Sequence, residues 1–277
     1  MADPVKPLLR NLCVTLATFS FSLCLPLNAQ QSLYAQSIQT ALARTTPNLE
    51  ILVLDLRTHE ILADTFHNPQ NPIPIGSLLK PFLAVAYFKT HPGPSPTVLC
   101  HGHADRCWKD GGHGAMTLTH AIAQSCNAFF LSLAQSIDPA AIPYLPPPPH
   151  DASPATLIGL TPDWRISPVA LAEAYSSLLA QPVSPTQTGI LAGMHESARR
   201  GTANRIGAHP GGVLAKTGTA PCVDKPCKAS GDGLVISAFP AAHPTLLLLV
   251  RKRATTGAMT AAAAGPILSQ LEFLHAD

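Results

Sequence analysis

Ser77-Leu78-Leu79-Lys80 is the first of three short polar motifs in a largely apolar chain, and Ser125-Cys126-Asn127 and Lys216-Thr217-Gly218-Thr219 follow it in that order. The segment that Ser77 begins has the apolar spacing of a helix, with Pro81 near its first turn, where a missing N–H does least harm. Residues three apart in a helix lie one turn apart on the same face. We therefore expect the Lys80 amine to reach the Ser77 hydroxyl.

Whether Ser77 and Lys80 can act together as a nucleophile and a base depends on whether the lysine amine is protonated. A serine hydroxyl is a poor nucleophile until a base takes its proton, and lysine is a base only if burial or another cation lowers the pKa of its amine. A helix N-terminus at Ser77 would add free backbone N–H groups that suit a developing oxyanion. The structural alternative is a solvated lysine, because Ser-x-x-Lys alone occurs often by chance.

Ser125 and Asn127 lie within an apolar helical segment, residues 117–134, and we expect a break or turn near Ser125. At positions i and i+2, both could face one site while Cys126 turns into the core. Ser125 would then relay a proton to a leaving group, and Asn127 would hold a substrate amide. The alternative is a serine and an asparagine that bond their own backbone at a helix break.

The third motif lies on a predicted strand. Alternation places Lys216 and Gly218 on one face and Thr217 and Thr219 on the other. Gly218 would let another segment approach the backbone closely, and a strand edge here could pair with an extended peptide. An ordinary strand with an exposed lysine is the alternative.

The order of predicted elements favours a single architecture. Residues 49–64 predict a hairpin, and residues 212–219, 233–239 and 245–251 predict three more strands. Helices are predicted over 31–44, 77–89, 117–134, 167–179, 186–200 and 256–274. A sheet built from both ends of the chain, with helices inserted in the middle, accounts for this order. Pro146 to Pro149 predict a stiff loop rather than a linker between domains, because the third motif still lies ahead.

The composition excludes some classes of function. The chain has 277 residues, is 46% hydrophobic and 12% charged, and carries a formal net charge of +2. This length suffices for one large domain or two small ones. Because the net charge is small and no basic run occurs, we expect no nucleic-acid partner.

The N-terminus predicts export. Lys6 and Arg10 precede an apolar stretch, residues 12–27, that is short for a spanning helix of roughly 20 residues. Leu27-Asn28-Ala29 offers a cleavage site. We therefore interpret residues 1–29 as a signal peptide, cleaved or kept as a membrane anchor, and residues 30–277 as the exported domain. A buried N-terminal helix is the alternative.

The seven cysteines fit an oxidising compartment. Cys100/Cys107 and Cys222/Cys227 form two close pairs in polar loops, and each pair could close a short loop as a disulfide. We expect the leftover Cys126 to be a buried free thiol.

Cys100 and Cys107 bracket His101 and His103, which also suggests a zinc site. Four ligands this close together would be strained around one ion, and the usual ligand spacings do not fit. We therefore favour a disulfide and predict no metal site. His113 and His120 are expected to be structural or exposed.

The ordered motifs resemble those of the penicillin-binding protein and serine β-lactamase superfamily, above all the transpeptidase domain of penicillin-binding proteins. The flanking residues strengthen this resemblance: residues 76–82, Gly112-His113-Gly114, residues 125–130, Gly201-Thr202-Ala203 and residues 216–220. The resemblance extends from about Leu49 to the C-terminus. It implies an α+β fold with a central antiparallel sheet built from N- and C-terminal strands, flanked by helices, and an inserted all-helical subdomain.

The resemblance also implies a role for each motif residue. Ser77 would be the acylated nucleophile, Lys80 its general base, Ser125 a proton relay, and Lys216 a group that tunes the electrostatics of the pocket. Asn127 would bind the acyl-side amide, and Thr217 and Thr219, on either side of Gly218, would meet the substrate carboxylate. The backbone N–H groups of Ser77 and Thr219 would form the oxyanion hole.

The implied function is an exported D,D-transpeptidase or D,D-carboxypeptidase that acts on D-Ala-D-Ala peptidoglycan stem peptides and is inhibited by β-lactams. Its expected location is the periplasm or the outer face of a bacterial inner membrane, and no cofactor is implied. A serine β-lactamase and a non-catalytic β-lactam or muropeptide sensor are the alternatives.

Class A β-lactamases carry a loop glutamate between the second and third motifs. Here Glu173 and Glu196 fall within predicted helices rather than in a loop. Asp163 lies in a loop, but the residues around it, Thr161-Pro162-Asp163-Trp164, do not match those of the class A loop. We therefore do not expect fast hydrolysis of the acyl-enzyme.

Overall fold

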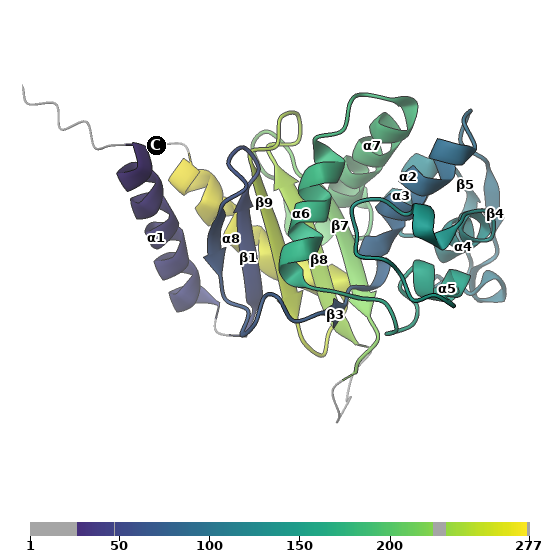
Figure 1. Cartoon of the computed structure of the whole chain (residues 1–277), viewed down its shortest axis with the longest axis horizontal. Helices are drawn as coiled ribbons and strands as arrows, with labels where there is room; N and C mark the ends of the chain where they lie inside the picture. Colours follow the sequence, from purple (N-terminus) through teal and green to yellow (C-terminus); the bar gives the residue numbers. More distant parts are fainter. Residues whose placement is uncertain (1–26, 47, 224–230, 276–277) are drawn as a thin grey trace, which may run out of the picture.

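A five-stranded antiparallel sheet forms the centre of the computed structural model, which describes residues 27–46, 48–223 and 231–275 (Figure 1). The strand order is β2-β1-β9-β8-β7. The strands are β1 (Glu50–Asp55), β2 (Ile61–Asp64), β7 (Leu214–Ala220), β8 (Asp232–Phe239) and β9 (Leu246–Lys252). Both ends of the chain therefore contribute to one antiparallel sheet, as the sequence predicts.

The two faces of the sheet are buried under different layers. Ile51 and Val53 of β1 pack with α1 (Leu27–Thr45) and α8 (Gly257–His275). Leu52 and Leu54, which alternate with them, pack with the helical part of the molecule. In Figure 1, α8 lies behind the sheet and α6 (Pro168–Leu179) lies in front of it. The period of two along each strand thus supplies two apolar faces, and each face is covered by helices.

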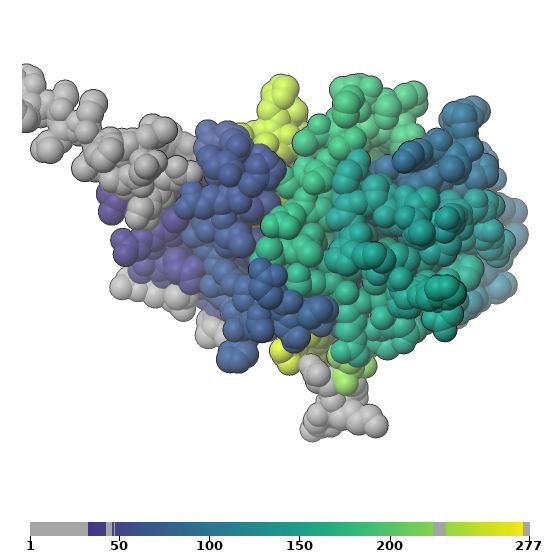
Figure 2. Space-filling model, in the orientation of Figure 1, coloured from purple at the N-terminus to yellow at the C-terminus, as the bar shows by residue number. Residues whose placement is uncertain are grey.

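The inserted part of the chain is mainly helical. It contains α2 (Lys80–Thr90), α3 (Leu118–Ala123), α4 (Asn127–Ala134), α5 (Pro154–Leu157), α6 and α7 (Pro185–Arg200). Short 3₁₀ turns lie at η1 (Gly76–Leu79), η2 (Gly102–Asp105), η3 (Pro139–Ala141) and η4 (Asn204–Ile206). On the face shown in Figure 2, the green part of the chain, which includes α6, lies against the dark blue β1–β2 region.

Two small antiparallel pairs also occur in the inserted part and were not predicted. One joins β3 (Ile73–Pro74) to β6 (Arg165–Ile166), and the other joins β4 (Val98–Cys100) to β5 (Gly114–Met116). Strands of two or three residues are too short to show alternation, so the sequence gives no signal for them.

The helix boundaries follow local chemistry. Ser167 and Ser184 cap α6 and α7 by accepting hydrogen bonds from the backbone N–H groups of Ala170 and Gln187. The predicted break near Ser125 is confirmed, since α3 ends at Ala123 and α4 begins at Asn127. The predicted helix over 77–89 instead begins with the 3₁₀ turn η1, and its α-helical part starts at Lys80.

The loop between β4 and β5 corrects one prediction. Cys100 and Cys107 are free thiols rather than a disulfide. Each points to His113 instead, whose Nδ1 atom lies 3.5 Å from Cys100 Sγ and 3.4 Å from Cys107 Sγ. Cys126 is a buried free thiol, as predicted. Cys227 lies outside the described residues, so its pairing with Cys222 stays a prediction.

The N-terminal segment is only partly described. Residues 1–26 of the predicted signal lie outside the described residues, and residues 27–29 form the start of α1. Among the helices that the structure describes, none is both long and apolar enough to span a membrane.

Candidate active site

The three motifs meet in one cleft of about 390 Å³, where the sheet adjoins the helical part. The predicted site residues that line it are Ser77, Ser125, Asn127, Thr217 and Thr219. Lys80 and Lys216 contact Ser125, and each of the two lysines is fully buried. The structure therefore brings together segments that are far apart in the sequence.

Close backbone packing positions Ser77 at this cleft. A Cβ atom added at Gly218 would lie 2.5 Å from the carbonyl oxygen of Ile75, and one added at Gly76, whose φ is +57°, would lie 2.6 Å from that of Thr219. No side chain fits at either position, so the two glycines allow η1 to lie against β7. As a result, Ser77 lies beside the third motif, with Thr219 as its neighbour across the contact.

Lys80 is held by the second motif. Its Nζ donates hydrogen bonds to the Ser125 carbonyl oxygen at 2.7 Å, to Ser125 Oγ at 3.2 Å and to Asn127 Oδ1 at 2.7 Å. Burial of the amine lowers the pKa of Lys80 to about 7. A neutral amine keeps two N–H donors for the carbonyl and amide oxygens and frees a lone pair that can accept a proton. Lys80 thus has the environment that a general base requires.

The predicted approach of the Lys80 amine to the Ser77 hydroxyl does not take the form of a hydrogen bond. Among the described residues, no hydrogen bond joins Ser77 Oγ to Lys80 Nζ, because the amine is directed at the turn containing Ser125. The hydroxyl of Ser77 is half-buried at the cleft. Hydrogen bonds of catalytic groups often tighten only when a substrate binds.

Lys216 approaches the same hydroxyl of Ser125 from the sheet. Its Nζ donates to Ser125 Oγ at 2.8 Å and to the Thr217 carbonyl oxygen at 2.8 Å. Burial, together with repulsion by the nearby Lys80, holds the pKa of Lys216 well below its ordinary value. Two amines this close and this buried disfavour carrying two positive charges at once, so Ser125 lies between groups that can exchange a proton.

Ser125 adopts an unusual backbone conformation to reach both lysines. Its φ is +51°, in the left-handed region that residues with a side chain seldom occupy. It sits in the turn between α3 and α4, and the next residue, Cys126, is fully buried, as predicted. Such strain persists only where surrounding contacts fix it, and it is common at functional sites.

The third motif forms the far wall of the cleft. β7 is the last strand at one edge of the described sheet, so its outer edge has no neighbouring strand there. Thr217 Oγ1 donates to Thr202 Oγ1 at 2.6 Å, and Thr219 Oγ1 accepts from the Gly257 N–H at 3.0 Å. Their hydroxyls are therefore fixed at the cleft by groups from other elements.

Trp108 also lines the cleft and was not identified from the sequence. Its indole N–H donates to the Ser125 carbonyl oxygen at 3.3 Å, the oxygen that Lys80 also contacts. From the sequence, Trp108 is only a large aromatic residue in a polar loop. Such a residue is weak evidence for a place in the cleft unless the position of the loop is known.

No aspartate or glutamate occurs among the described residues that line the cleft. Asp163 lines a different hollow, beside Asp151 and Arg165. Glu173 is exposed on α6, and Glu196 pairs with Arg200 on α7. A carboxylate positioned to activate water against an acyl-enzyme is therefore missing from these lining residues.

Comparisons with known proteins bear on the fold. No family model matches the sequence, and no curated protein matches it. The structure is similar to the transpeptidase domain of Burkholderia pseudomallei penicillin-binding protein 3, with a TM-score of 0.66 and 18% identity over 89% of this chain and 95% of that chain. It is also similar to Pseudomonas aeruginosa PBP2, solved in complex with WCK 5153, with a TM-score of 0.67 and 17% identity over 88% of this chain and 74% of that one.

A third solved structure, Helicobacter pylori PBP2, gives a TM-score of 0.73 and 14% identity over 86% of this chain and 63% of that one. Together these similarities confirm the predicted fold class. The chain has the α+β fold of penicillin-binding protein transpeptidase domains.

Proposed function

We propose that this chain is an exported serine acyl-transferase that forms an acyl-enzyme through Ser77 on the D-Ala-D-Ala end of peptidoglycan stem peptides. One observation carries the proposal. The hydroxyl of Ser125 is shared by two buried lysine amines, 3.2 Å from Lys80 Nζ and 2.8 Å from Lys216 Nζ, at the cleft that Ser77 lines. This arrangement provides a base, a relay and a nucleophile in one place.

In the first step, neutral Lys80 takes the Ser77 proton, and Ser77 Oγ attacks the carbonyl carbon of the penultimate D-Ala. The negative oxygen that forms would lie at the backbone N–H groups of Ser77 and Thr219. The peptide bond then breaks, and the departing D-Ala amine receives a proton through Ser125. Lys80 supplies that proton and returns to its neutral form.

Substrate orientation would come from the groups that surround this centre. The hydroxyls of Thr217 and Thr219 would bind the terminal carboxylate, and the Asn127 side chain would bind the acyl-side amide. The free edge of β7, next to Gly218, would pair with the extended peptide. A β-lactam would acylate Ser77 in the same way and so act as an inhibitor.

Release of the acyl group would follow attack by an amine of a second stem peptide, as in a transpeptidase, or by water, as in a carboxypeptidase. The absence of a carboxylate among the described cleft residues argues for slow attack by water on a β-lactam adduct. This observation favours a penicillin-binding enzyme over a β-lactamase. Acylation without turnover of any peptide would instead indicate a sensor.

We further propose that the protein acts in the periplasm or at the outer face of the inner membrane. Support comes from the sequence of residues 1–29, where basic residues precede a short apolar stretch and a small residue ends the segment. Peptidoglycan precursors are the substrates available there. Residues 1–29 would be removed on export or kept as an anchor.

Intact-mass measurement after exposure to penicillin tests this function. We expect a single covalent adduct on the unmodified protein that persists over time, and no adduct on Ser77→Ala. Ser177→Ala is a matched control, because Ser177 is also half-buried but lies on α6 and is not among the cleft residues. Labelling that survives Ser77→Ala would refute the proposal, and rapid loss of the adduct would indicate a β-lactamase.

A further inference from the structure

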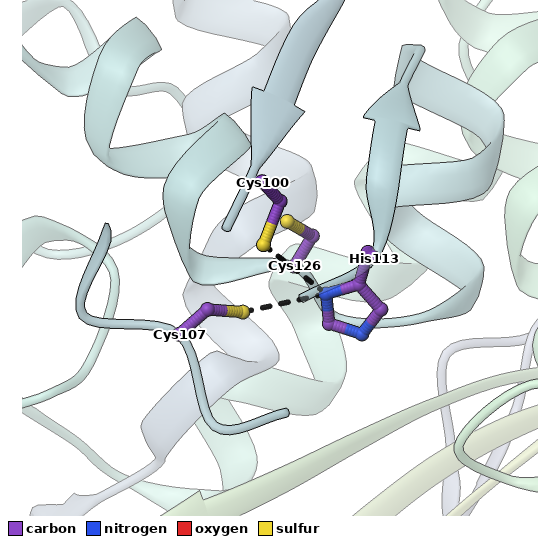
Figure 3. Close-up of side chains that lie close together, drawn as sticks. All are labelled: Cys100, Cys107, His113 and Cys126. Atoms are coloured by element: carbon purple, nitrogen blue, oxygen red, sulfur yellow. Dashed lines mark hydrogen bonds between the residues drawn. The ribbon is translucent and has the colours of Figure 1, made fainter. Parts of the chain in front are cut away.

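Three cysteines and one histidine converge beside the second motif (Figure 3). Cys100 ends β4, Cys107 follows η2, His113 precedes β5, and Cys126 directly precedes α4. The three Sγ atoms and the imidazole nitrogen lie within 4.8 Å of one another. Figure 3 shows the side chains directed at a common centre from separate parts of the backbone.

The distances within this cluster fit one tetrahedral metal ion. In protein sites Zn–S bonds are about 2.3 Å and Zn–N bonds are about 2.0–2.1 Å, so a tetrahedron has N···S edges of about 3.6 Å and S···S edges of about 3.8 Å. His113 Nδ1 lies 3.5 Å from Cys100 Sγ and 3.4 Å from Cys107 Sγ. The ligand atoms therefore need only small movements to enclose an ion.

We propose that Cys100, Cys107, Cys126 and His113 bind one structural Zn²⁺ through three thiolates and the imidazole Nδ1. Three sulfur ligands and one imidazole are a donor set that suits zinc, and four protein ligands leave no open position for a substrate. Each thiol releases its proton to solvent when the metal binds. His101 and His103, the histidines of the zinc alternative that the sequence analysis set aside, do not belong to this cluster, because their side chains are exposed and pair with Asp105 and Asp110.

The loop that carries the ligands is folded tightly on itself. A Cβ atom added at Gly112, whose φ is +75°, would lie 2.1 Å from the carbonyl oxygen of Cys100. The Cys107 N–H donates to the Gly102 carbonyl oxygen at 3.0 Å, and Cys107 Sγ accepts from the Asn127 N–H at 3.3 Å. The backbone thus holds the sulfur atoms close together and already donates a hydrogen bond to one of them.

Neither a disulfide nor simple packing accounts for all four side chains of the cluster. A disulfide between any two of the thiols would leave the third thiol and the imidazole with no role in the cluster. A packing role for small apolar cysteines would give the partly buried His113 only weak contacts from Nδ1 to two thiols, at 3.5 and 3.4 Å. These contacts would have to offset the cost of its buried Nε2 atom, which has no hydrogen-bond partner among the described residues. Coordination through Nδ1 gives this imidazole a strong interaction that offsets its burial.

An ion at this position would also affect the active site, because one of its ligands lies in the second motif. Cys126 stands between Ser125 and Asn127, the two residues that hold the Lys80 amine. A metal bound to Cys126 would tie this turn to the β4–β5 hairpin. In this respect the inference rests on the proposed function, and the zinc ligands act as positioning residues rather than catalytic ones.

Metal content of the purified full-length chain tests the proposal. We expect about one zinc ion per chain by elemental mass spectrometry, and, after replacement by Co²⁺, the visible and thiolate charge-transfer bands of a tetrahedral cobalt–thiolate site. Cys107→Ser and His113→Gln should lower the metal content several-fold. His103→Gln is the matched control, because it alters a histidine of the same loop that lies outside the cluster.

Chelation of the unmodified protein covers the case in which these variants fail to fold. Removal of the ion should lower the melting temperature, and Zn²⁺ but not Mg²⁺ should restore it. The proposal fails if the reduced protein contains no metal and takes up no Co²⁺, or if non-reducing mass analysis finds a disulfide within the cluster. Neither readout requires a reactive Ser77, so failure of the zinc site and failure of the proposed enzyme can be told apart.

Discussion

Lys216 Nζ lies 2.8 Å from Ser125 Oγ, although the two residues are 91 positions apart in the chain. Lys80 Nζ lies 3.2 Å from the same oxygen. One hydroxyl therefore links a lysine of the helical part to a lysine of the sheet. Burial, together with repulsion by Lys80, holds the pKa of Lys216 well below its ordinary value, so two charged amines are disfavoured here. In the proposed mechanism, a proton would pass between the two amines through Ser125.

Ser125→Ala should slow acylation of Ser77 by penicillin by about 100-fold, since general acid–base groups typically contribute that much or more. The variant removes the hydroxyl that both lysines contact but leaves Ser77 in place. Time-resolved intact mass measures the rate. Ser136→Ala, an exposed serine after α4, serves as the control. An unchanged acylation rate in Ser125→Ala would exclude the relay.

The acylation rate should rise as the pH is raised through about 7, the pKa to which burial lowers Lys80. Below this pH the amine is protonated and cannot take the Ser77 proton, and above it the neutral base predominates. In Lys80→Arg the guanidinium group stays charged over this whole pH range. This variant should therefore lose the rise in rate, along with most of its activity. A rate that falls with rising pH across this range would contradict Lys80 as the base.

Stability should also depend on pH. The folded-state pKa of Lys80, about 7, lies below its ordinary value of 10.5, so between these pH values the unfolded chain holds a proton that the folded protein lacks. The free energy of unfolding should therefore increase with pH across this window. Denaturant titrations at two pH values measure the slope, which should be smaller in Lys80→Met than in the unmodified protein.

Gly218→Ala should force β7 away from η1, because the added methyl group would lie 2.5 Å from the Ile75 carbonyl oxygen. We expect a loss of about 1–3 kcal/mol in the free energy of unfolding and a large loss of penicillin labelling. Gly111→Ala is the matched control, since nothing lies within 4 Å of its added Cβ. Equal behaviour of the two variants would show that close packing at Gly218 is unimportant.

Arg251→Leu should destabilise the sheet by about 3 kcal/mol, because it removes the buried arginine that pairs with two partly buried carboxylates. Arg251 is buried on β9 and pairs with Glu50 of β1 and Asp232 of β8. Arg253→Leu removes an exposed arginine that also contacts Glu50 and should cost less than about 1 kcal/mol. Chemical denaturation compares the two, and a similar effect of both would argue against the buried network.

The sequence predicted those parts of the site that depend on the regular spacing of side chains along a strand or a helix. Alternation along β7 assigned Lys216 and Gly218 to one face, and the structure places Lys216 against Ser125 and Gly218 against Ile75. The break in the apolar helix at Ser125 could be inferred because polar residues interrupt it there. Both signals are local, so they do not depend on how distant segments pack.

The cysteine–histidine cluster could not be predicted in the same way. His113 lies 13 residues from Cys100 and reaches it only because the short strands β4 and β5 pair. Those strands have three residues each and no periodic pattern. Without the hairpin, the nearest candidates in sequence were His101 and His103, whose side chains are exposed. Trp108 was missed for the same reason, since its place at the cleft depends on this loop.

Trp108 gives the cleft an optical reporter of its own. The chain has two tryptophans, and Trp164 is only 3% exposed, whereas Trp108 is 52% exposed and lines the cleft. Indole emission shifts with the polarity around the ring, so a ligand that enters should alter the fluorescence of one residue against a constant background from the other. Occupancy can thus be followed in the unlabelled protein, with an unmodified peptide, as it binds.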